Sequence, residues 1–394
     1  MAFDFDRIIE RRGTDCEKWD GLAGLFGVDG PDVLPLWVAD MDFAAPPAVV
    51  EALCARAAHG VYGYTAMLPQ FFAATASWMR RRHGWEVEPE WIRYAPGVVA
   101  GLSMCIQALT EPGDKVLFQS PVYPPIFLSI ERNGRVPVNN RLAIREDGKG
   151  RHYEMDFDDL EKKLASGVKL AVLCSPHNPA GRVWRNDELS RFVELCLRHG
   201  ATPVSDEIHH DLVFAPHRHT VLAALSPEAA DACVVCCAPS KTFNIAGLQT
   251  SNVIIKNPEI RTRFMRAQAA NAVFDPNPFG VEALKAAYTE GEPWLDALLA
   301  YLTANLDHLR SRLAAELPGV TLFPAEAMHL AWIDCSGLGL SDQELEKKLL
   351  HEARLVLNMG PRFGPGGEGF VRLNFACPRA TLDAGIDRFV RALG

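Results

Sequence analysis

The stretch ACVVCCAPSKTFN, residues 232–244, joins a continuously apolar segment to a turn that carries a lysine. Its first six residues are all Ala, Cys or Val, which is typical of a strand covered on both faces. Pro239 ends this segment, and Ser240 and Lys241 follow at once. Ligands of open α/β sheets bind beyond the carboxyl ends of strands, so this turn is a candidate for chemistry.

Similar segments recur along the chain and alternate with amphipathic stretches. The predicted strands are 115–119, 169–174, 202–207, 232–237 and 251–255, and the predicted helices are 98–110, 156–165, 187–199 and 258–271. This order predicts an α/β fold with a mostly parallel central sheet in a large domain.

The two ends of the chain have a different character. Residues 1–45 show little helical periodicity until Pro46-Pro47 opens a helix. From about residue 286 a long helical stretch precedes the strand-like segments 328–335 and 369–376, with a helix at 341–352 between them. We therefore expect an N-terminal arm (1–45) that joins a smaller α+β domain (286–394), and a large domain (46–285).

Composition excludes several classes of protein. The 394 residues include 40 Lys and Arg against 49 Asp and Glu, a net charge of −9, which argues against a general nucleic-acid binder. No apolar run reaches the roughly 18 residues of a membrane span, and the N-terminus shows no secretory signal. We expect a cytoplasmic protein with reduced thiols and no membrane partner.

Chemically distinctive side chains follow four of the predicted strands. Tyr123 follows 115–119, Asn178 follows 169–174, Asp206 ends the third strand and Lys241 follows the fourth. Such a set suits a flat, anionic ligand with an aromatic ring nitrogen. The aromatic side chain can stack on the ring, the carboxylate can keep its nitrogen protonated, the amide can donate to a ring oxygen, and the lysine can form an imine.

A helix N-terminus adds an anion site to this set. In APGVVAGL (95–102), Gly97 precedes an apolar helix whose first backbone N–H groups are free. Ser240 can contribute a hydroxyl. This combination suits a phosphate monoester.

Eight segments of the chain resemble one enzyme group in that group's order. They are RRGTDCEKWD, LPLWVADMDF, VYGYT, PGVVAGL, SPHNPAGRVW, SDEIHHD, APSKTFNIAGLQTSN and FVRLNFACPR. The chain resembles the MalY/PatB group of C–S β-lyases, which belongs to the aspartate-aminotransferase superfamily of fold type I enzymes dependent on pyridoxal 5'-phosphate (PLP). The resemblance covers almost the whole sequence.

The resemblance implies a role for each cofactor residue. Lys241 would carry the Schiff base, Asp206 would pair with the pyridinium nitrogen, Asn178 would bind the ring oxygen, and Tyr123 would stack on the ring. The phosphate would be held by the backbone N–H groups of Val98 and Val99, by Ser240, and by Tyr64 of a neighbouring subunit. His209 and Gln249 stand where the wider superfamily commonly has Tyr and Arg, which fits the lyase subgroup.

The resemblance also implies a substrate site and an assembly. Arg372 would bind the α-carboxylate as a bidentate fork, helped by Asn178 and the backbone near Ala39. The role of Tyr64 implies a homodimer with active sites at the interface, although Tyr62 is an alternative for that contact.

The implied reaction converts L-cystathionine or a related cysteine S-conjugate to a thiol, pyruvate and ammonia. Lys241 and Tyr123 are the expected catalytic residues, with Lys241 as general base at Cα. An aminotransferase would use nearly the same residues and is the alternative. A non-enzymatic binding protein is a third hypothesis, which the intact set of site residues disfavours.

Three further sequence features resemble functional motifs but are expected to be structural. His209, His210, Asp211, His217 and His219 resemble a metal site, but no metal-binding spacing is present, so we expect no metal. Cys233 and Cys236 form a C-x-x-C inside an apolar segment, where buried structural thiols are expected. The glycine-rich segment 364–369 is expected to be a flexible loop.

Overall fold

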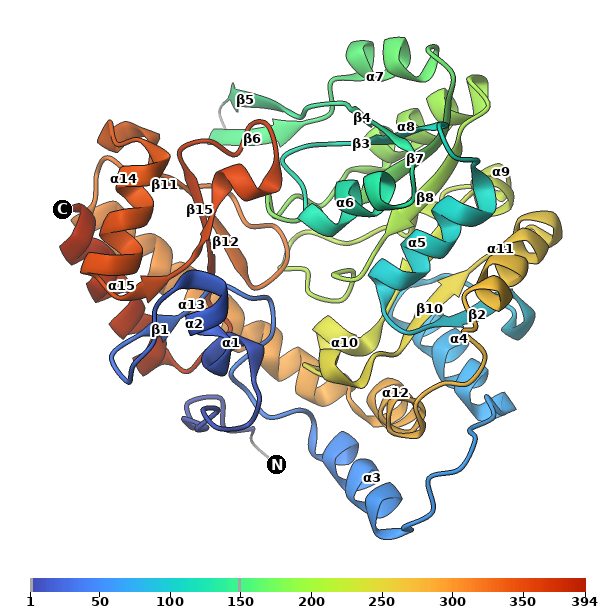
Figure 1. Cartoon of the computed structure of the whole chain (residues 1–394), viewed down its shortest axis with the longest axis horizontal. Helices are drawn as coiled ribbons and strands as arrows, with labels where there is room; N and C mark the ends of the chain where they lie inside the picture. Colours follow the sequence, from blue (N-terminus) through green and yellow to red (C-terminus); the bar gives the residue numbers. More distant parts are fainter. Residues whose placement is uncertain (1–2, 148–149) are drawn as a thin grey trace.

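A computed structural model describes residues 3–147 and 150–394, and its largest sheet has seven strands in the order β2-β10-β9-β8-β7-β3-β4. They are β2 (Ile92–Ala95), β3 (Lys115–Phe118), β4 (Val136–Asn139), β7 (Val168–Cys174), β8 (Thr202–Asp206), β9 (Val234–Cys237) and β10 (Ser251–Ile254). Strand β10 is antiparallel to both neighbours, and the pairs from β9 to β4 are parallel. The predicted mostly parallel α/β sheet is confirmed (Figure 1).

Burial on both faces explains the apolar strand sequences. Along β7, Leu170 and Val172 enter one hydrophobic cluster, whereas Ala171 and Leu173 enter another. Helix α5 (Val98–Leu109) contacts both α6 (Pro124–Arg132) and α11 (Pro258–Ala270), and α7 (Phe157–Leu164) contacts α8 (Asn186–Arg198). Because successive side chains of a strand point to opposite faces, both faces need apolar residues here.

A group of helices lies beside the β2 edge of this sheet. It comprises α3 (Pro47–Ala58), α4 (Pro69–His83) and α12 (Pro278–Glu290), with α12 packed against both others. Residues 59–68, between α3 and α4, form no helix or strand, and they extend from the body of the molecule with α3 (Figure 1). Helix α3 begins at Pro47, as the double proline predicts.

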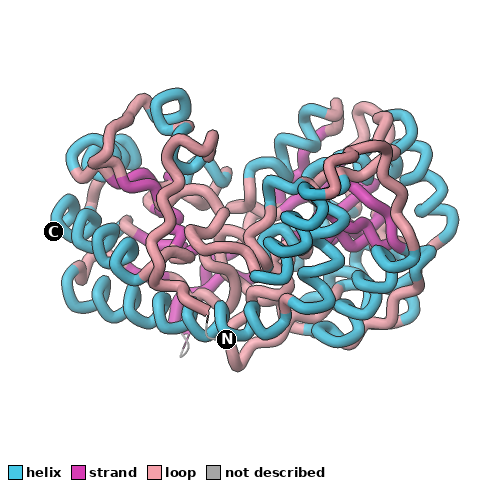
Figure 2. The backbone as a smooth tube through the Cα atoms, turned by 90° about the horizontal axis from the view of Figure 1, so that it is seen from below, coloured by secondary structure: helices cyan, strands magenta, loops and turns pink. Residues whose placement is uncertain are grey.

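A smaller sheet is built from the C-terminal part. Its antiparallel strands lie in the order β11 (Thr321–Leu322), β12 (Leu330–Asp334), β15 (Phe370–Asn374) and β14 (Asn358–Met359). The helices around it include α13 (Glu292–Glu316), α14 (Asp342–Lys347) and α15 (Arg379–Leu393). Figure 2 shows strands inside and helices outside in both parts of the molecule.

The N-terminal arm packs against these C-terminal elements. It contains α1 (Glu17–Asp20), α2 (Leu22–Phe26) and β1 (Leu34–Pro35), and β1 pairs in parallel with β13 (Leu355–Val356). The remaining elements include the hairpin of β5 (Ala143–Asp147) and β6 (Gly150–Glu154), and the short helices α9 (Pro227–Ala232) and α10 (Pro239–Thr242). The division into domains at residues 45 and 285 stays a prediction.

Three of the differences between the structure and the sequence-based expectation have a clear physical reason. The edge strands β2 and β4 were not expected, because their sequences IRYA and VPVN mix polar and apolar residues. The helical stretch from residue 286 is two helices separated at Gly291, where a Cβ would lie 2.5 Å from the Ala287 carbonyl oxygen. The helix expected at 341–352 ends as a π-helical turn, Lys348–Glu352.

Candidate active site

A cavity of about 540 Å³ opens beyond the carboxyl ends of β7, β8 and β9. The start of α5, helix α6, the segment before β10, the arm and the β14–β15 region supply its other walls. It is lined by Ala39, Val98, Val99, Tyr123, Asn178, Asp206, His209, Ser240, Lys241 and Arg372. The structure therefore brings together every expected site residue except Tyr64.

Lys241 lies in the short helix α10, directly after β9. Its side chain is half-buried, and Nζ donates to the carbonyl oxygen of Ala39 at 3.2 Å. Desolvation by the surrounding protein lowers the pKa of this amine, although the charge of Asp40 opposes the shift. A lysine with a lowered pKa has a larger neutral fraction, which is the form that attacks carbonyl carbon.

Asp206 ends β8 and is buried beside the lysine. It accepts a hydrogen bond from the Ile208 N–H at 3.2 Å. Burial raises the pKa of Asp206 to about 6, the charge of Glu207 adds to this, and Lys241 opposes it. A buried carboxylate of this kind is stabilised as an anion only by a cation placed against it, so it fits a protonated ring nitrogen.

Arg372 presents a buried guanidinium from strand β15. Nη1 donates to Asn178 Oδ1 and Nη2 to the Trp37 carbonyl oxygen, both at 3.0 Å. Nε has no hydrogen-bond partner, and no carboxylate in the described chain forms an ion pair with this side chain. Burial lowers the pKa of Arg372 to about 10. The unpaired cation fits a small carboxylate ligand, because guanidinium binds carboxylate through two parallel hydrogen bonds.

Tyr123 and Asn178 are joined through their backbones. The Tyr123 N–H donates to the Asn178 carbonyl oxygen at 2.9 Å, which fixes the start of α6 against the loop after β7. Burial raises the pKa of the Tyr123 hydroxyl, so the phenol stays protonated at neutral pH. Since Asn178 Oδ1 accepts from Arg372, its amide Nδ2 is left to donate into the cavity.

The anion site lies at the start of α5. Gly97 has a φ of 107°, a conformation that favours glycine, and α5 begins at Val98. The first N–H groups of a helix have no partner within it, so those of Val98 and Val99 can hold an anion. Ser240 lies on the same cavity, as do Gln249 and Thr250.

A family model described as aminotransferase class I and II matches residues 31–389. The chain belongs to the aminotransferase class I and II family. The family predicted from the sequence motifs is therefore confirmed, and with it the α/β fold.

Relatives within the family align over almost the full length. Cystathionine beta-lyase PatB of Bacillus subtilis is 48% identical over 391 residues, which cover 99% of this chain and 100% of PatB. Protein MalY of Escherichia coli is 35% identical, with 99% of both chains covered. Cystalysin from Treponema denticola, solved with a pyridoxal 5'-phosphate cofactor, superposes with a TM-score of 0.95 at 35% identity, over 100% of this chain and 99% of that one. The PLP-bound C–S lyase from Staphylococcus hominis has a TM-score of 0.92 at 32% identity, with 100% and 98% coverage.

Two histidines of this family member lie side by side at the cavity. The ring of His209, which lines it, lies 6.2 Å from that of His329, and His329 Nε2 lies 3.1 Å from the Ala39 carbonyl oxygen. Burial lowers the pKa of both, to about 3 for His329, so both are neutral at pH 7. A neutral imidazole can donate or accept one hydrogen bond at each nitrogen without adding charge.

Tyr64 lies outside the cavity of its own chain. The residue is 99% exposed, in the extended segment between α3 and α4. The Tyr62 hydroxyl donates to the Ala57 carbonyl oxygen at 2.6 Å, so its polar end is already used. Of the two tyrosines, Tyr64 has the hydroxyl that is free to contact another molecule.

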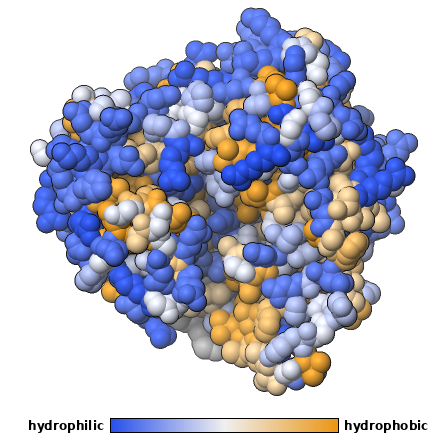
Figure 3. All heavy atoms as spheres, in the orientation of Figure 1, coloured by the Kyte–Doolittle hydropathy of each residue, from blue (hydrophilic) through white to orange (hydrophobic). Residues whose placement is uncertain are grey.

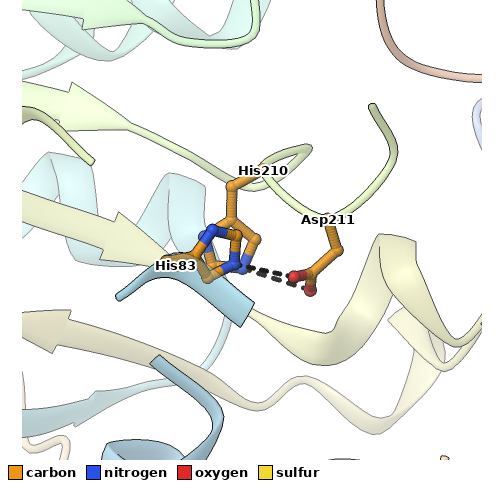
Figure 4. A group of neighbouring side chains, drawn as sticks. All are labelled: His83, His210 and Asp211. Atoms are coloured by element: carbon orange, nitrogen blue, oxygen red, sulfur yellow. Dashed lines mark hydrogen bonds and ion pairs between the residues drawn. The ribbon is translucent and has the colours of Figure 1, made fainter. Parts of the chain in front are cut away.

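The histidine-rich segment after β8 forms a hydrogen-bonded cluster behind α10. His83 from α4 joins His210 and Asp211, and their potential ligand atoms lie within 4.8 Å of one another (Figure 4). Both oxygens of Asp211 already accept hydrogen bonds, from His83 at 2.8 Å, from Trp78 at 3.1 and 3.2 Å and from Thr242 at 2.7 Å. A metal ion would have to displace these donors. That the protein holds no metal stays a prediction.

The two cysteines of the C-x-x-C lie in and just before β9. Both are buried, and burial raises the pKa of Cys233 far above that of a free thiol. A raised pKa disfavours the reactive thiolate, which agrees with a structural role.

Several cavity residues were not found from the sequence. They are Glu17, Trp37, Arg132, Thr250, Asn358 and Arg362. Glu17 and Trp37 come from the arm, and Asn358 and Arg362 come from β14 and the turn after it, where no periodic pattern marks a functional position. Asn358 lies opposite Arg372 in the strand register, and its side-chain amide donates to the Trp37 carbonyl oxygen. A prediction that β14 pairs with β15 would have placed Asn358 beside Arg372.

Proposed function

We propose that this chain is a PLP-dependent carbon–sulfur β-lyase that cleaves L-cystathionine or a related cysteine S-conjugate to a thiol, pyruvate and ammonia. The observation that carries the proposal is the meeting of Lys241, Asp206 and the unpaired Arg372 in one cavity. The full-length similarity to PatB, a cystathionine beta-lyase, supports the lyase outcome.

The residues present fit the cofactor. Asp206 would hold the ring nitrogen, the Asn178 amide the ring oxygen, and Tyr123 a ring face. The N-terminus of α5 and Ser240 would hold the phosphate, with His209 beside the ring. When bound at Lys241, PLP supplies an electron sink for the negative charge that develops at Cα.

The side chains of this chain bind and orient the amino acid. Arg372, helped by Asn178 and the Ala39 backbone, would hold the α-carboxylate and so fix the direction of the Cα–H bond. Lys241 Nζ, whose pKa is lowered, would then remove the Cα proton as general base. Its contact with the Ala39 carbonyl keeps the amine at the cavity wall from which this transfer occurs.

An aminotransferase is the second candidate. The matching family model carries that description, and a transaminase needs the same lysine, aspartate and arginine. The similarity to PatB and to the Staphylococcus hominis C–S lyase favours the β-lyase.

We further propose a homodimer in which Tyr64 reaches the phosphate of the partner's cofactor. Apolar side chains gather over α3 at the lower edge of the face in Figure 3. The adjoining segment exposes Val61, Tyr62, Tyr64 and Leu68. A contiguous exposed apolar surface of this kind is typical of an interface.

The cellular location and the domain division are proposals of the same kind. No helix among the described residues is long and apolar enough to cross a membrane. The ten cysteines are unpaired in the structure, which fits a reducing compartment such as the cytoplasm. We propose an arm (1–45) and a C-terminal domain (286–394) packed together beside the large domain (46–285), supported by the β1–β13 pairing.

The test is incubation of purified, PLP-loaded protein with L-cystathionine and no keto acid, followed by quantification of pyruvate, ammonia and thiol. We expect release of all three over many turnovers, and none from Lys241→Ala. Amino transfer to an added keto acid, without pyruvate release from cystathionine, would identify an aminotransferase instead. Near-normal pyruvate release from Lys241→Ala would contradict the role of that lysine.

A further inference from the structure

The charged residues of the cavity fall into two groups. Asp206, Lys241 and Arg372 lie at its inner end, and the proposed reaction uses all three. Glu17, Arg132 and Arg362 also line the cavity but have no part in that reaction. All three are exposed, and two of them, Glu17 and Arg362, are one anion and one cation that could receive a charged group of their own.

Arg362 lies close to the α-carboxylate site. It belongs to the short helix Gly360–Phe363, directly after β14, whose Asn358 is opposite Arg372 in register. The Arg372 guanidinium lies 4.9 Å from the centre of the Phe363 ring, and the charge of Arg362 contributes to lowering the pKa of Arg372. Arg362 is therefore the next positive charge outward from the residue that would bind the α-carboxylate.

No acid among the described residues pairs with Arg362. Within residues 3–147 and 150–394 its side chain forms no hydrogen bond or ion pair, and its guanidinium lies over the Phe26 ring of α2, 5.8 Å from the ring centre. That ring comes from the arm, so the guanidinium lies between the arm and the β14 turn. A planar cation held over an aromatic ring keeps its in-plane N–H donors free for a carboxylate.

Glu17 provides an unpaired negative charge at the start of α1. Glu17 lines the cavity, where its negative charge adds to the raised pKa of Tyr123 and partly opposes the lowered pKa of Lys241. The described structure gives this carboxylate no hydrogen bond or ion pair of its own. By contrast, the other charged residues nearby in the arm are paired with one another: Arg11, Lys18, Asp40 and Asp42.

We propose that Arg362 and Glu17 form a second subsite for the distal end of the thioether, with Arg362 binding a carboxylate and Glu17 an ammonium group. This inference rests on the proposed lyase function. The preferred substrates are then thioethers whose leaving side carries an amino-acid group, and uncharged S-alkyl cysteines are turned over less efficiently.

Arg132 offers a matched control within the same cavity. Pro124, Leu128 and Arg132 line the cavity at four-residue spacing along α6. At 1.5 Å per residue, Arg132 lies about 12 Å along the helix from Pro124, at the outer rim. Removing its charge changes the net charge of the cavity as much as removing that of Arg362, but not at the proposed contact.

The experiment compares three substrates that share one reacting centre. L-cystathionine has a distal carboxylate and ammonium, S-carboxypropyl-L-cysteine has the carboxylate alone, and S-propyl-L-cysteine has neither. The kcat/KM of each is measured from pyruvate release for the PLP-loaded wild type and for Arg362→Gln, Glu17→Gln and Arg132→Gln.

We expect Arg362→Gln to lower kcat/KM about 10-fold for the two substrates with a distal carboxylate, and by less than about threefold for S-propyl-L-cysteine. This is the size of one charge-assisted hydrogen bond that water partly screens. Glu17→Gln should lower kcat/KM for L-cystathionine alone. Arg132→Gln should change all three by less than about threefold.

Two results would overturn the subsite. One is an equal loss on all three substrates in Arg362→Gln, and the other is an equal loss in Arg132→Gln and Arg362→Gln, which would indicate general electrostatics. If the wild type releases pyruvate from none of the substrates, the lyase proposal itself is wrong. The subsite is then judged by calorimetric binding of L-cystathionine, which Arg362→Gln must weaken and Arg132→Gln must not.

Discussion

Arg372 carries a buried positive charge that the described chain leaves without a carboxylate, and Asp206 carries a buried acid that has a single backbone donor. Burying a charge without a counter-ion costs several kcal/mol, so neither residue is explained by folding alone. Each is explained by a group that arrives from outside, a carboxylate at one end of the cavity and a cationic ring nitrogen at the other. These two buried groups thus make the ligand-free protein less stable, and binding of a ligand that pairs with them restores the lost stability.

The first prediction concerns Arg372. Arg372→Gln should lower kcat/KM about 100-fold, because truncation of a buried, hydrogen-bonded charge partner costs roughly 2–5 kcal/mol. Arg372→Lys keeps the charge but loses the fork, so it should recover only part of the activity. Steady-state kinetics on L-cystathionine, with thermal melting to verify folding, checks both. Full activity in the glutamine variant would show that the α-carboxylate binds elsewhere.

The second prediction concerns the pH dependence of the apo-protein through Asp206. The folded-state pKa of about 6 exceeds the ordinary value of 3.8, so folding favours the protonated acid. This residue therefore opposes folding increasingly as pH rises from about 4 to 6, up to about 3 kcal/mol at 1.36 kcal/mol per pKa unit. Apo Asp206→Asn should be more stable than apo wild type at pH 7.5, and the difference should vanish near pH 4. Urea unfolding at both pH values measures this, and PLP binding by the variant should be weaker.

At the scale of elements, Asp211 ties three segments together behind the lysine. It accepts from Trp78 of α4 and from Thr242, the residue after Lys241 in α10, and it lies next to His210 in the turn after β8. Burial alone would raise the pKa of the Asp211 carboxyl. The charges and hydrogen bonds of His210 and His83 outweigh this effect and hold the pKa well below its usual range. Asp211 therefore stabilises the folded protein fully at pH values above the pKa that it has in the unfolded chain. This contribution is lost as the pH falls through the lower pKa of the folded state.

The third prediction follows from that hub. Asp211→Asn replaces one acceptor oxygen by a donor that faces the donors Trp78 and Thr242, and should lower the free energy of unfolding by about 2–4 kcal/mol. The control is Asp296→Asn, an exposed partner of Arg82, which should change it by less than about 1 kcal/mol. Urea unfolding at pH 7.5 tests both. If the two substitutions lowered the free energy of unfolding equally, the buried hydrogen bonds of Asp211 would contribute no more to stability than an exposed ion pair.

The strands that the sequence predicted differ in composition from the strands that it missed. Central strands such as β7 are apolar on both faces and are visible in the sequence, whereas the edge strands β2 and β4 carry polar residues and are not. The site residues that follow central strands were predicted for the same reason. Glu17 and Arg362 could not be, because tertiary packing alone brings the arm and the β14 turn to the cavity. The antiparallel direction of β10 likewise leaves no mark in its composition.

At the scale of the whole molecule, the fourth prediction concerns assembly. We expect sedimentation to give a mass near 87 kDa, twice the 43.4 kDa of the chain. Tyr64→Phe removes only the exposed hydroxyl, so it should preserve the dimer and weaken PLP binding about 10-fold, because a hydrogen bond to a charged group contributes about 1.5–3 kcal/mol. Tyr62→Phe, whose hydroxyl is bonded within its own chain, is the control and should leave PLP affinity unchanged. A monomer that binds PLP with full affinity would contradict the shared site.

The pairing of β1 with β13 sets the order in which this protein can mature. Leu34 lies opposite Leu355, so the arm reaches its place only after the chain has been synthesised through residue 355 and has left the ribosome. Contacts between residues so far apart in sequence close late and slowly, because the intervening chain must be ordered first. The strand with Arg372 is made later still. A nascent chain therefore exposes its lysine before it has the arm and the Arg372 strand that line the substrate site, so its substrate selectivity is acquired late in synthesis.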